Sequence, residues 1–97
     1  MIPYEFHYEA EDELVESAVF YESRVIGLGE SFTSEVQRAV NIIRNHPALG
    51  SPLGAKVRRF LVRRFPYNVI YRHDEGRIFI LAVAHQHRRP GYWRHRE

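Results

Sequence analysis

The chain contains no cysteine, so it can form neither a disulfide framework nor a zinc site built on thiolates. Long hydrophobic runs are also missing. The longest extends only from Ile78 to Ala84, whereas a transmembrane helix needs about 20 apolar residues. The start, MIPYEFHYEAEDE, is acidic and lacks a basic region followed by an apolar stretch, so we expect no secretory signal and no membrane contact. These absences favour a protein of the reducing cytoplasm.

Basic residues are scarce in the first half of the chain and abundant in the second. Residues 1–48 hold three arginines against nine Asp and Glu, whereas residues 49–97 hold eleven Lys and Arg against three Asp and Glu. The basic half is almost all arginine, whose planar guanidinium suits phosphate and carboxylate. The asymmetry indicates a basic surface that attracts polyanions, nucleic acid first. The plainer interpretation, that the charges only keep two surfaces soluble, stays open.

The first half predicts a short strand followed by two helices. Aromatic and polar residues alternate from Tyr4 to Glu9, which is typical of a strand. Helical spacing follows at Leu14, Ala18, Tyr21, Val25 and Leu28. A break at Gly27–Gly29 separates this helix from a second one, whose apolar stripe is Phe32, Val36, Ala39, Val40 and Ile43. The second helix is expected to end at His46, before Pro47, and the pair forms an antiparallel hairpin.

The second half predicts three strands. Apolar and basic residues alternate over 57–65, NVIYR follows at 68–72, and HDEG at 73–76 is a turn. The last strand, RIFILAVAH at 77–85, is apolar on both faces and therefore expected to be central and buried. The order β-α-α-β-β-β predicts an α+β fold, with the helix hairpin on one face of a small, curved antiparallel sheet. At 97 residues we expect one domain, residues 1–97.

The basic half contains the groups that a metal-free ribonuclease needs. Arginines would stabilise the phosphorane charge, and His or Tyr side chains would move protons. The candidates for charge are Arg58, Arg59, Arg63, Arg64 and Arg72, and those for proton transfer are His85, His87, Tyr92 and His95. Plainer roles stay open: His85 as a packing residue, Tyr92 and Trp93 as a cap on the core, and Tyr67 and Tyr71 as core residues. Without a carboxylate near the histidines, no metal site is expected.

Several segments together resemble the RelE/ParE toxin superfamily. They are AVFYESRVIGLGESFTSEVQRAVNIIRNHPALGSPL, VRRFLVRRFPYNVIYR with a D-x-G turn after it, and RIFILAVAHQHRRPGYW. The resemblance extends from about Tyr8 to Arg94 and is closest to the ParE-like branch, often labelled plasmid stabilisation proteins. It implies a toxin of a type II toxin–antitoxin pair, held inactive by a small antitoxin. RelE-like members cut mRNA on the ribosome, and ParE-like members poison DNA gyrase.

The resemblance also implies which residues form the site. RelE-like nucleases carry basic residues on the first strand after the helices, an Arg before the next apolar run, and an Arg with Tyr or His near the C-terminus. Here Arg59 matches one basic position, but Leu61 and Asn68 occupy two others. If the chain is a nuclease, its catalytic residues are Arg59, Arg88 and Tyr92, with Arg89 able to replace Arg88. The residues expected to bind a target or antitoxin are Arg58, Arg64, Asn68, His85, His87, Arg89 and Trp93.

The two lost basic positions favour a toxin that binds gyrase without chemistry of its own. Each missing charge-assisted contact would weaken transition-state stabilisation by roughly 2–4 kcal/mol. Two alternatives stay open: a ribosome-dependent mRNA endoribonuclease of RelE type, and a decayed toxin that acts only as a binding module. In each case we expect a cognate antitoxin as partner, with no metal and no small-molecule cofactor.

Overall fold

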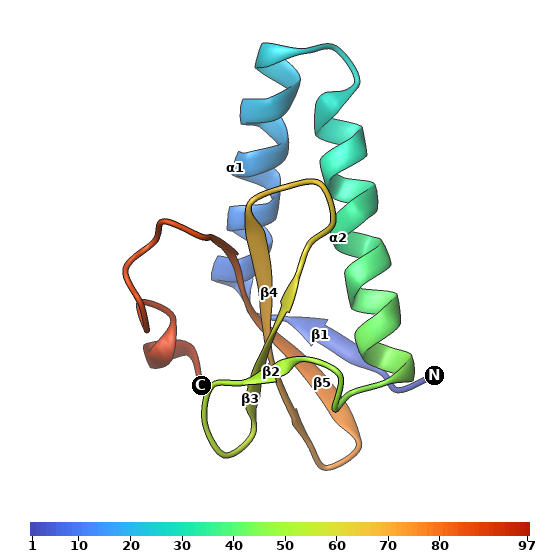
Figure 1. Cartoon of the computed structure of the whole chain (residues 1–97), viewed down its shortest axis with the longest axis vertical. Helices are drawn as coiled ribbons and strands as arrows, with labels where there is room; N and C mark the ends of the chain where they lie inside the picture. The colour runs from blue at the N-terminus through green and yellow to red at the C-terminus, as the bar shows by residue number, and fades with distance from the viewer.

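The computed structural model describes all 97 residues and consists of a helix hairpin packed on a five-stranded sheet (Figure 1). The helices are α1, Tyr8–Arg24, and α2, Leu28–Asn45. The strands are β1, Tyr4–Phe6; β2, Ser51–Pro52; β3, Val57–Leu61; β4, Tyr67–Asp74; and β5, Arg77–His85, and a short 3-10 helix, η1, follows at Arg94–Arg96. The order of elements confirms the predicted α+β arrangement, with β2 as an addition. Neither helix is long and apolar enough to cross a membrane.

The first helix begins earlier than predicted. We expected a strand from Tyr4 to Glu9, but β1 ends at Phe6, because His7 takes an extended conformation and its Nδ1 accepts the Glu9 amide at 3.1 Å. This side-chain cap satisfies one of the free amides at the start of α1. The predicted stripe is also too long, since Val25 is exposed and Leu28 already belongs to α2.

A tight link joins the two helices. Gly27 has a φ of 88°, a left-handed conformation that glycine adopts without strain. Gly29 approaches α1 so closely that a Cβ atom there would lie 2.5 Å from the Ala18 carbonyl oxygen. The Glu22 carboxylate accepts the amides of both glycines, at 2.9 and 3.0 Å. The predicted break therefore also fixes how closely the helices pack, and the tip of the hairpin projects beyond the sheet (Figure 1).

The strands lie in the order β1-β5-β4-β3-β2. Neighbours pair antiparallel as predicted, except that β1 runs parallel to β5 through Tyr4–Ile78 to Phe6–Ile80, so the sheet is mixed. The middle strand is β4, and β5 lies beside it, inside the sheet and buried along most of its length. The strand predicted over 57–65 ends at Leu61, because the chain turns at Arg64, whose φ is 74°.

Apolar side chains form a core on each face of the sheet. The larger core lies under the helices and contains all five predicted stripe residues of α2 together with Tyr67 and Tyr71. On the other face Val57, Ile70 and Leu81 pack with Trp93, whose side chain folds back from the C-terminal segment. The expectation that Trp93 caps the core is therefore confirmed, and the end of the chain is part of the packed structure.

Leu81 and Leu61 provide a matched test of this second core. Leu81 on β5 is fully buried, whereas Leu61 on β3 is 57% exposed. We expect Leu81→Ala to lower the free energy of unfolding by about 2–5 kcal/mol, because it leaves a cavity in a packed core. Leu61→Ala should change it by less than about 0.5 kcal/mol in the same urea titration. Equal effects of the two substitutions would contradict the observed placement of β5.

Candidate functional site

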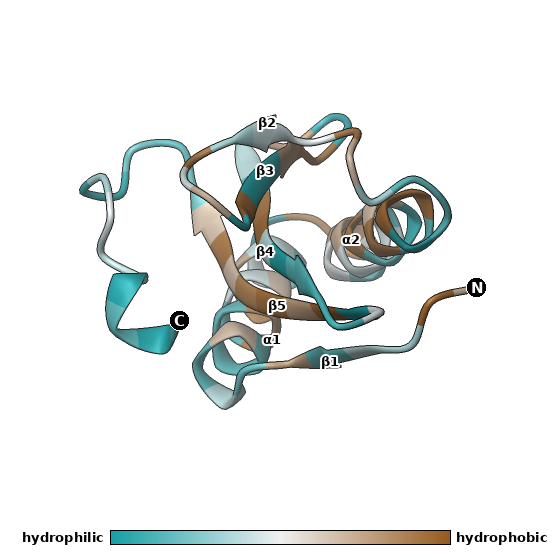
Figure 2. Ribbon diagram, turned by 90° about the horizontal axis from the view of Figure 1, so that it is seen from below, coloured by the Kyte–Doolittle hydropathy of each residue, from teal (hydrophilic) through white to brown (hydrophobic).

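The chain after β5, residues 86–97, forms a tail that leaves the sheet and turns back toward α1 (Figures 1 and 2). The turn is possible because Gly91 has a φ of 76°, which a larger residue would adopt only with strain. The Gln86 amide donates to the Pro66 carbonyl at 2.8 Å and fixes the start of the tail to the β3–β4 connection. The other end is fixed by charged side chains.

The Glu13 carboxylate on α1 holds the end of the tail. Its Oε1 accepts the Val83 amide and Arg96 Nη1, each at 3.0 Å, and its Oε2 accepts the Tyr92 hydroxyl at 2.8 Å and Arg96 Nη2 at 3.0 Å. Only 13% of the Glu13 side chain is exposed. One carboxylate therefore joins α1, β5 and the tail through paired, charge-assisted contacts, which are the strong class of hydrogen bond.

Arg96 completes this contact from the tail. Its side chain is only 4% exposed, and Nη1 also donates to the Leu81 carbonyl at 3.0 Å. Strand β1 pairs with β5 only as far as Ile80, so the backbone of Leu81 and Val83 has no strand partner on that side. Arg96 and Glu13 take the place of one, and their side chains close this part of the β5 edge.

Tyr92 is surrounded by these charges. Its ring contacts the guanidinium of Arg88, 3.8 Å from the ring centroid, and that of Arg96, at 5.1 Å. Burial raises the pKa of the Tyr92 phenol well above its ordinary value, and the hydrogen bond to the Glu13 carboxylate raises it further. The hydroxyl therefore stays protonated and acts as a donor at neutral pH.

The tail, the sheet and the end of β5 enclose a shallow cavity of about 210 Å³. Leu53, Ile70 and Ala84 form its apolar floor with Trp93. Seven of the predicted site residues line it, namely Arg59, Asn68, His85, Arg88, Arg89, Tyr92 and Trp93. The structure thus brings together the three residues expected of a nuclease and four of those expected to bind a partner.

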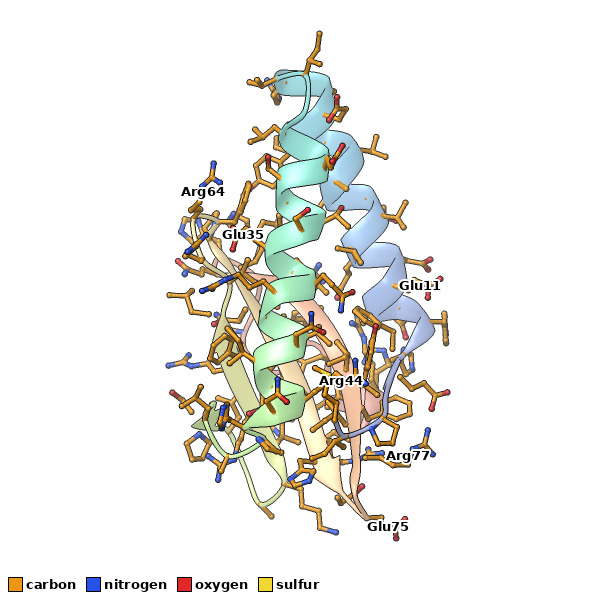
Figure 3. All side chains as sticks on the ribbon, turned by 90° about the vertical axis from the view of Figure 1, so that its right-hand side faces the viewer. Glu11, Glu35, Arg44, Arg64, Glu75 and Arg77 are labelled. Carbon is orange, nitrogen blue, oxygen red and sulfur yellow. The ribbon has the colours of Figure 1, made fainter.

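Three of the residues expected to bind a partner lie outside this cavity. Arg58 has a structural role, since its Nη1 donates hydrogen bonds to the carbonyls of Gly50 and Ala48 at 2.7 and 3.2 Å. His87 is exposed beyond the end of β5, where its ring meets that of His85 edge to face. Arg64 lies beside Glu35 at the α2 side of the molecule (Figure 3), in a separate polar depression.

Residues 4–90 match the sequence family described as "ParE toxin of type II toxin-antitoxin system, parDE". The chain belongs to the ParE toxin family. A solved chain of the "Chromosomal ParDE TA system from P. aeruginosa" shares its fold, with a TM-score of 0.62 and 19% identity over 88% of this chain and 96% of that chain. A comparison with curated proteins found no match. The predicted resemblance to the RelE/ParE superfamily is thus confirmed.

About half of the charged side chains of this ParE-family toxin form ion pairs within the chain. The tail places Arg88, His95 and Arg96 against the acidic start of α1, where they meet Glu9 and Glu13. The cavity retains two arginines, Arg59 and Arg89, that have no acidic partner and make no side-chain hydrogen bond within the chain. They are therefore the free cations of the site. The opposite charges of the two halves stabilise the fold where they are paired, and only the unpaired ones are free for binding.

A second surface of the ParE-family toxin is apolar and acidic. Large apolar side chains on α1 and the link to α2 are at least half exposed, namely Tyr8, Val15, Val19, Phe20, Val25 and Ile26. Acidic residues lie among them, and Glu11 points away from both α2 and the sheet (Figure 3). This surface lies on α1, whereas the basic cavity is built on β3, β4 and the tail.

Sequence reasoning missed the two residues that hold the site together, Glu13 and Arg96. Neither lies within the segments that carry the family resemblance, and 82 residues lie between them in the chain. The only signal was the complementary charge of the acidic first half and the basic tail, which is too general to identify a pair.

The Tyr92–Glu13 hydrogen bond gives the site a pH dependence. Tyr92→Phe should lower the free energy of unfolding by about 1 kcal/mol at neutral pH, because it removes one hydrogen bond. The folded-state pKa of Tyr92 is raised, so this contribution is complete below the ordinary tyrosine pKa and is lost as pH rises above it. The gap between the parent and Tyr92→Phe should therefore narrow above about pH 10 in urea titrations.

Tyr8→Phe is the matched control, since Tyr8 is 71% exposed and makes no side-chain hydrogen bond. This substitution should leave the free energy of unfolding unchanged at neutral and at alkaline pH. A gap for Tyr92→Phe that stays constant from neutral to alkaline pH would contradict the assigned hydrogen bond.

Proposed function

We propose that this ParE-family toxin acts in the cytoplasm by binding and inhibiting DNA gyrase, and that it does not cut RNA. The observation that carries the proposal is the chemistry of the cavity. Its lining supplies cations and hydrogen-bond donors, but no side chain placed to accept a proton from an RNA 2′-hydroxyl. Without a general base a ribonuclease loses a contribution of about 10²–10⁴ in rate.

Tyr92 is unsuited to the role of base. Its hydroxyl donates to Glu13, and its raised pKa keeps the proton in place. A phenolate would also have to form next to a carboxylate, which like-charge repulsion opposes.

His85 is held in a donor form by its neighbour. Its Nδ1 accepts the His87 amide at 3.0 Å, so in the neutral ring the proton is on Nε2. An imidazole in this tautomer offers an N–H, and it abstracts no proton from a substrate through Nε2. The remaining polar side chains of the lining are amides and guanidinium groups, which are not bases at neutral pH.

The charge of the cavity supports the same conclusion. Asn68, where RelE-like nucleases carry arginine, lies on β4 between Leu61 of β3 and Ala84 of β5, and it lines the cavity without a charge. Leu61 occupies a second position that is basic in those nucleases, and its side chain faces solvent. Arg59 and Arg89 instead suit a protein partner, because arginine is enriched among the residues that dominate interface energies. Trp93, which is packed in the second core, forms part of the apolar floor.

A second candidate, the ribosome-dependent mRNA endoribonuclease, is favoured by one observation. Arg59, Arg88 and Tyr92, the three residues that best match a nuclease, line the same cavity. On the ribosome, groups of the rRNA or the mRNA itself would then have to supply the missing base.

Induced expression separates the two candidates when DNA damage and translation are followed independently. A gyrase inhibitor should induce the SOS response while the rate of amino-acid incorporation stays normal at first. A nuclease should stop translation at once and produce cut mRNA. A toxin with neither effect would be a binding module only, which would contradict the proposal.

Asn68→Arg tests the missing charge directly. If the toxin binds gyrase, this substitution should create no RNA cleavage, because the base remains absent. If the toxin is a nuclease, Asn68→Arg should raise cleavage, and Arg59→Ala or Arg88→Ala should abolish it. Cleavage is measured on mRNA bound to purified ribosomes, and unchanged melting temperatures show that each variant is folded.

We also propose that a cognate antitoxin neutralises the toxin with an acidic segment that folds on binding. The free arginines of the cavity would pair with its carboxylates, and the exposed side chains of α1 offer an apolar surface for it to bury.

Titration with the co-encoded antitoxin checks this. A partner that binds only the folded toxin should stabilise it by about 2.7 kcal/mol at 100 times its dissociation constant. The melting temperature of the toxin should therefore rise with antitoxin concentration, and Arg59→Ala should reduce the rise. Arg38→Ala, which removes an exposed arginine on α2 away from the cavity, is the control and should leave it unchanged. No rise with the parent toxin would refute this antitoxin proposal.

A further inference from the structure

We propose that Glu13 and Arg96 are positioning residues, which hold the tail so that Arg88 and Arg89 stand at the wall of the basic cavity. This inference rests on the proposed binding role of that cavity and adds the residues that make it competent to bind. Neither Glu13 nor Arg96 lines the cavity, so they act on it only through the tail.

The stretch of the tail that forms the cavity wall is anchored at two points, one at each end. Residues 86–90 are exposed, and this stretch carries Arg88 and Arg89. At its start the Gln86 amide is bonded to Pro66, and at its end Tyr92 and Trp93 are held against the protein. Between these points the backbone makes only short-range turn contacts, such as Arg88 amide to His85 carbonyl at 3.0 Å. The position of the two arginines therefore depends on how firmly the second point is held.

Glu13 and Arg96 hold this second point. The Glu13 carboxylate accepts the Tyr92 hydroxyl, and the Arg96 guanidinium lies against the same ring while bonding both Glu13 and the Leu81 carbonyl. Arg88 completes the chain of contacts, since its guanidinium lies 3.8 Å from the Tyr92 ring centroid. Displacement of the ring would move Arg88 and the adjoining Arg89 with it.

The desolvation cost of burying the Glu13–Arg96 ion pair supports a role in positioning the tail. Arg96 Nε is buried without a hydrogen-bond partner, and a buried ion pair often contributes no more stability than a well-packed apolar pair. An apolar pair would have covered the β5 edge but could not have bonded the Tyr92 hydroxyl and the two backbone groups at once. The fixed directions of a carboxylate and a guanidinium define a single position for the tail.

A double-mutant cycle with Glu13→Gln and Arg89→Ala tests the inference, with the affinity of the full-length toxin for its co-encoded antitoxin as the readout. Arg89 does not contact Glu13, so coupling between them has to pass through the tail. If each single substitution weakens binding about 10-fold, the double variant should weaken it about 10-fold as well, because a displaced Arg89 has nothing further to lose. A merely structural Glu13 would instead give independent effects and about 100-fold weaker binding.

Two controls make each outcome decisive. Glu75→Gln removes an exposed carboxylate from the β4–β5 turn, outside both the cavity and the α1 surface, and should leave the affinity unchanged. If Glu13→Gln does not fold, Arg96→Lys replaces it in the cycle, since it keeps the charge but loses the paired hydrogen bonds. Independent effects overturn the positioning role alone. An affinity that Arg89→Ala leaves unchanged overturns the binding role of the cavity, and the positioning role fails with it.

Discussion

The rest of the site depends on the hydrogen bonds that the Glu13 carboxylate accepts. This carboxylate accepts hydrogen bonds from a strand amide, a phenol and a guanidinium, and so ties α1, β5 and the tail together. Chain ends normally fray because little holds them. Here two residues of the tail are buried, because Arg96 brings its charge into the protein and Trp93 fills part of the second core. A cavity exists on that face only because the tail stands above it.

The contacts between Glu13 and the tail also explain part of the charge asymmetry of the sequence. The acidic first half and the basic second half meet within one molecule, where Glu9 and Glu13 form ion pairs with Arg88 and Arg96 of the tail. Within the cavity, the arginines that remain free for a partner are Arg59 and Arg89. A donor-rich cavity with few free charges and no ready base suits recognition of a protein better than cleavage of RNA, which supports the proposed binding of gyrase.

The periodicity of apolar residues predicted the elements whose position depends on burying an apolar face. It failed for the features that depend on a single side-chain or backbone contact. The stripe from Phe32 to Ile43 is buried as expected, because an amphipathic helix shows its buried face in the sequence. The end of β1 depended on a side-chain cap by His7, and its parallel pairing with β5 joins the two ends of the chain, which no local pattern records. For the site, arginines near the strand ends were predictable, but the Glu13–Arg96 pair arises only from the tertiary fold.

Amide hydrogen exchange at Val83 tests most directly whether Glu13 fixes the tail. The Val83 amide has no strand partner on that edge and is protected by the Glu13 carboxylate alone. If the tail is held as described, this amide should exchange only when the whole protein unfolds, with the same denaturant dependence as amides in the middle of β4. Exchange of Val83 as fast as that of the exposed Arg89 amide, which makes no hydrogen bond, would show that the contact opens freely, and would contradict a tail fixed by Glu13.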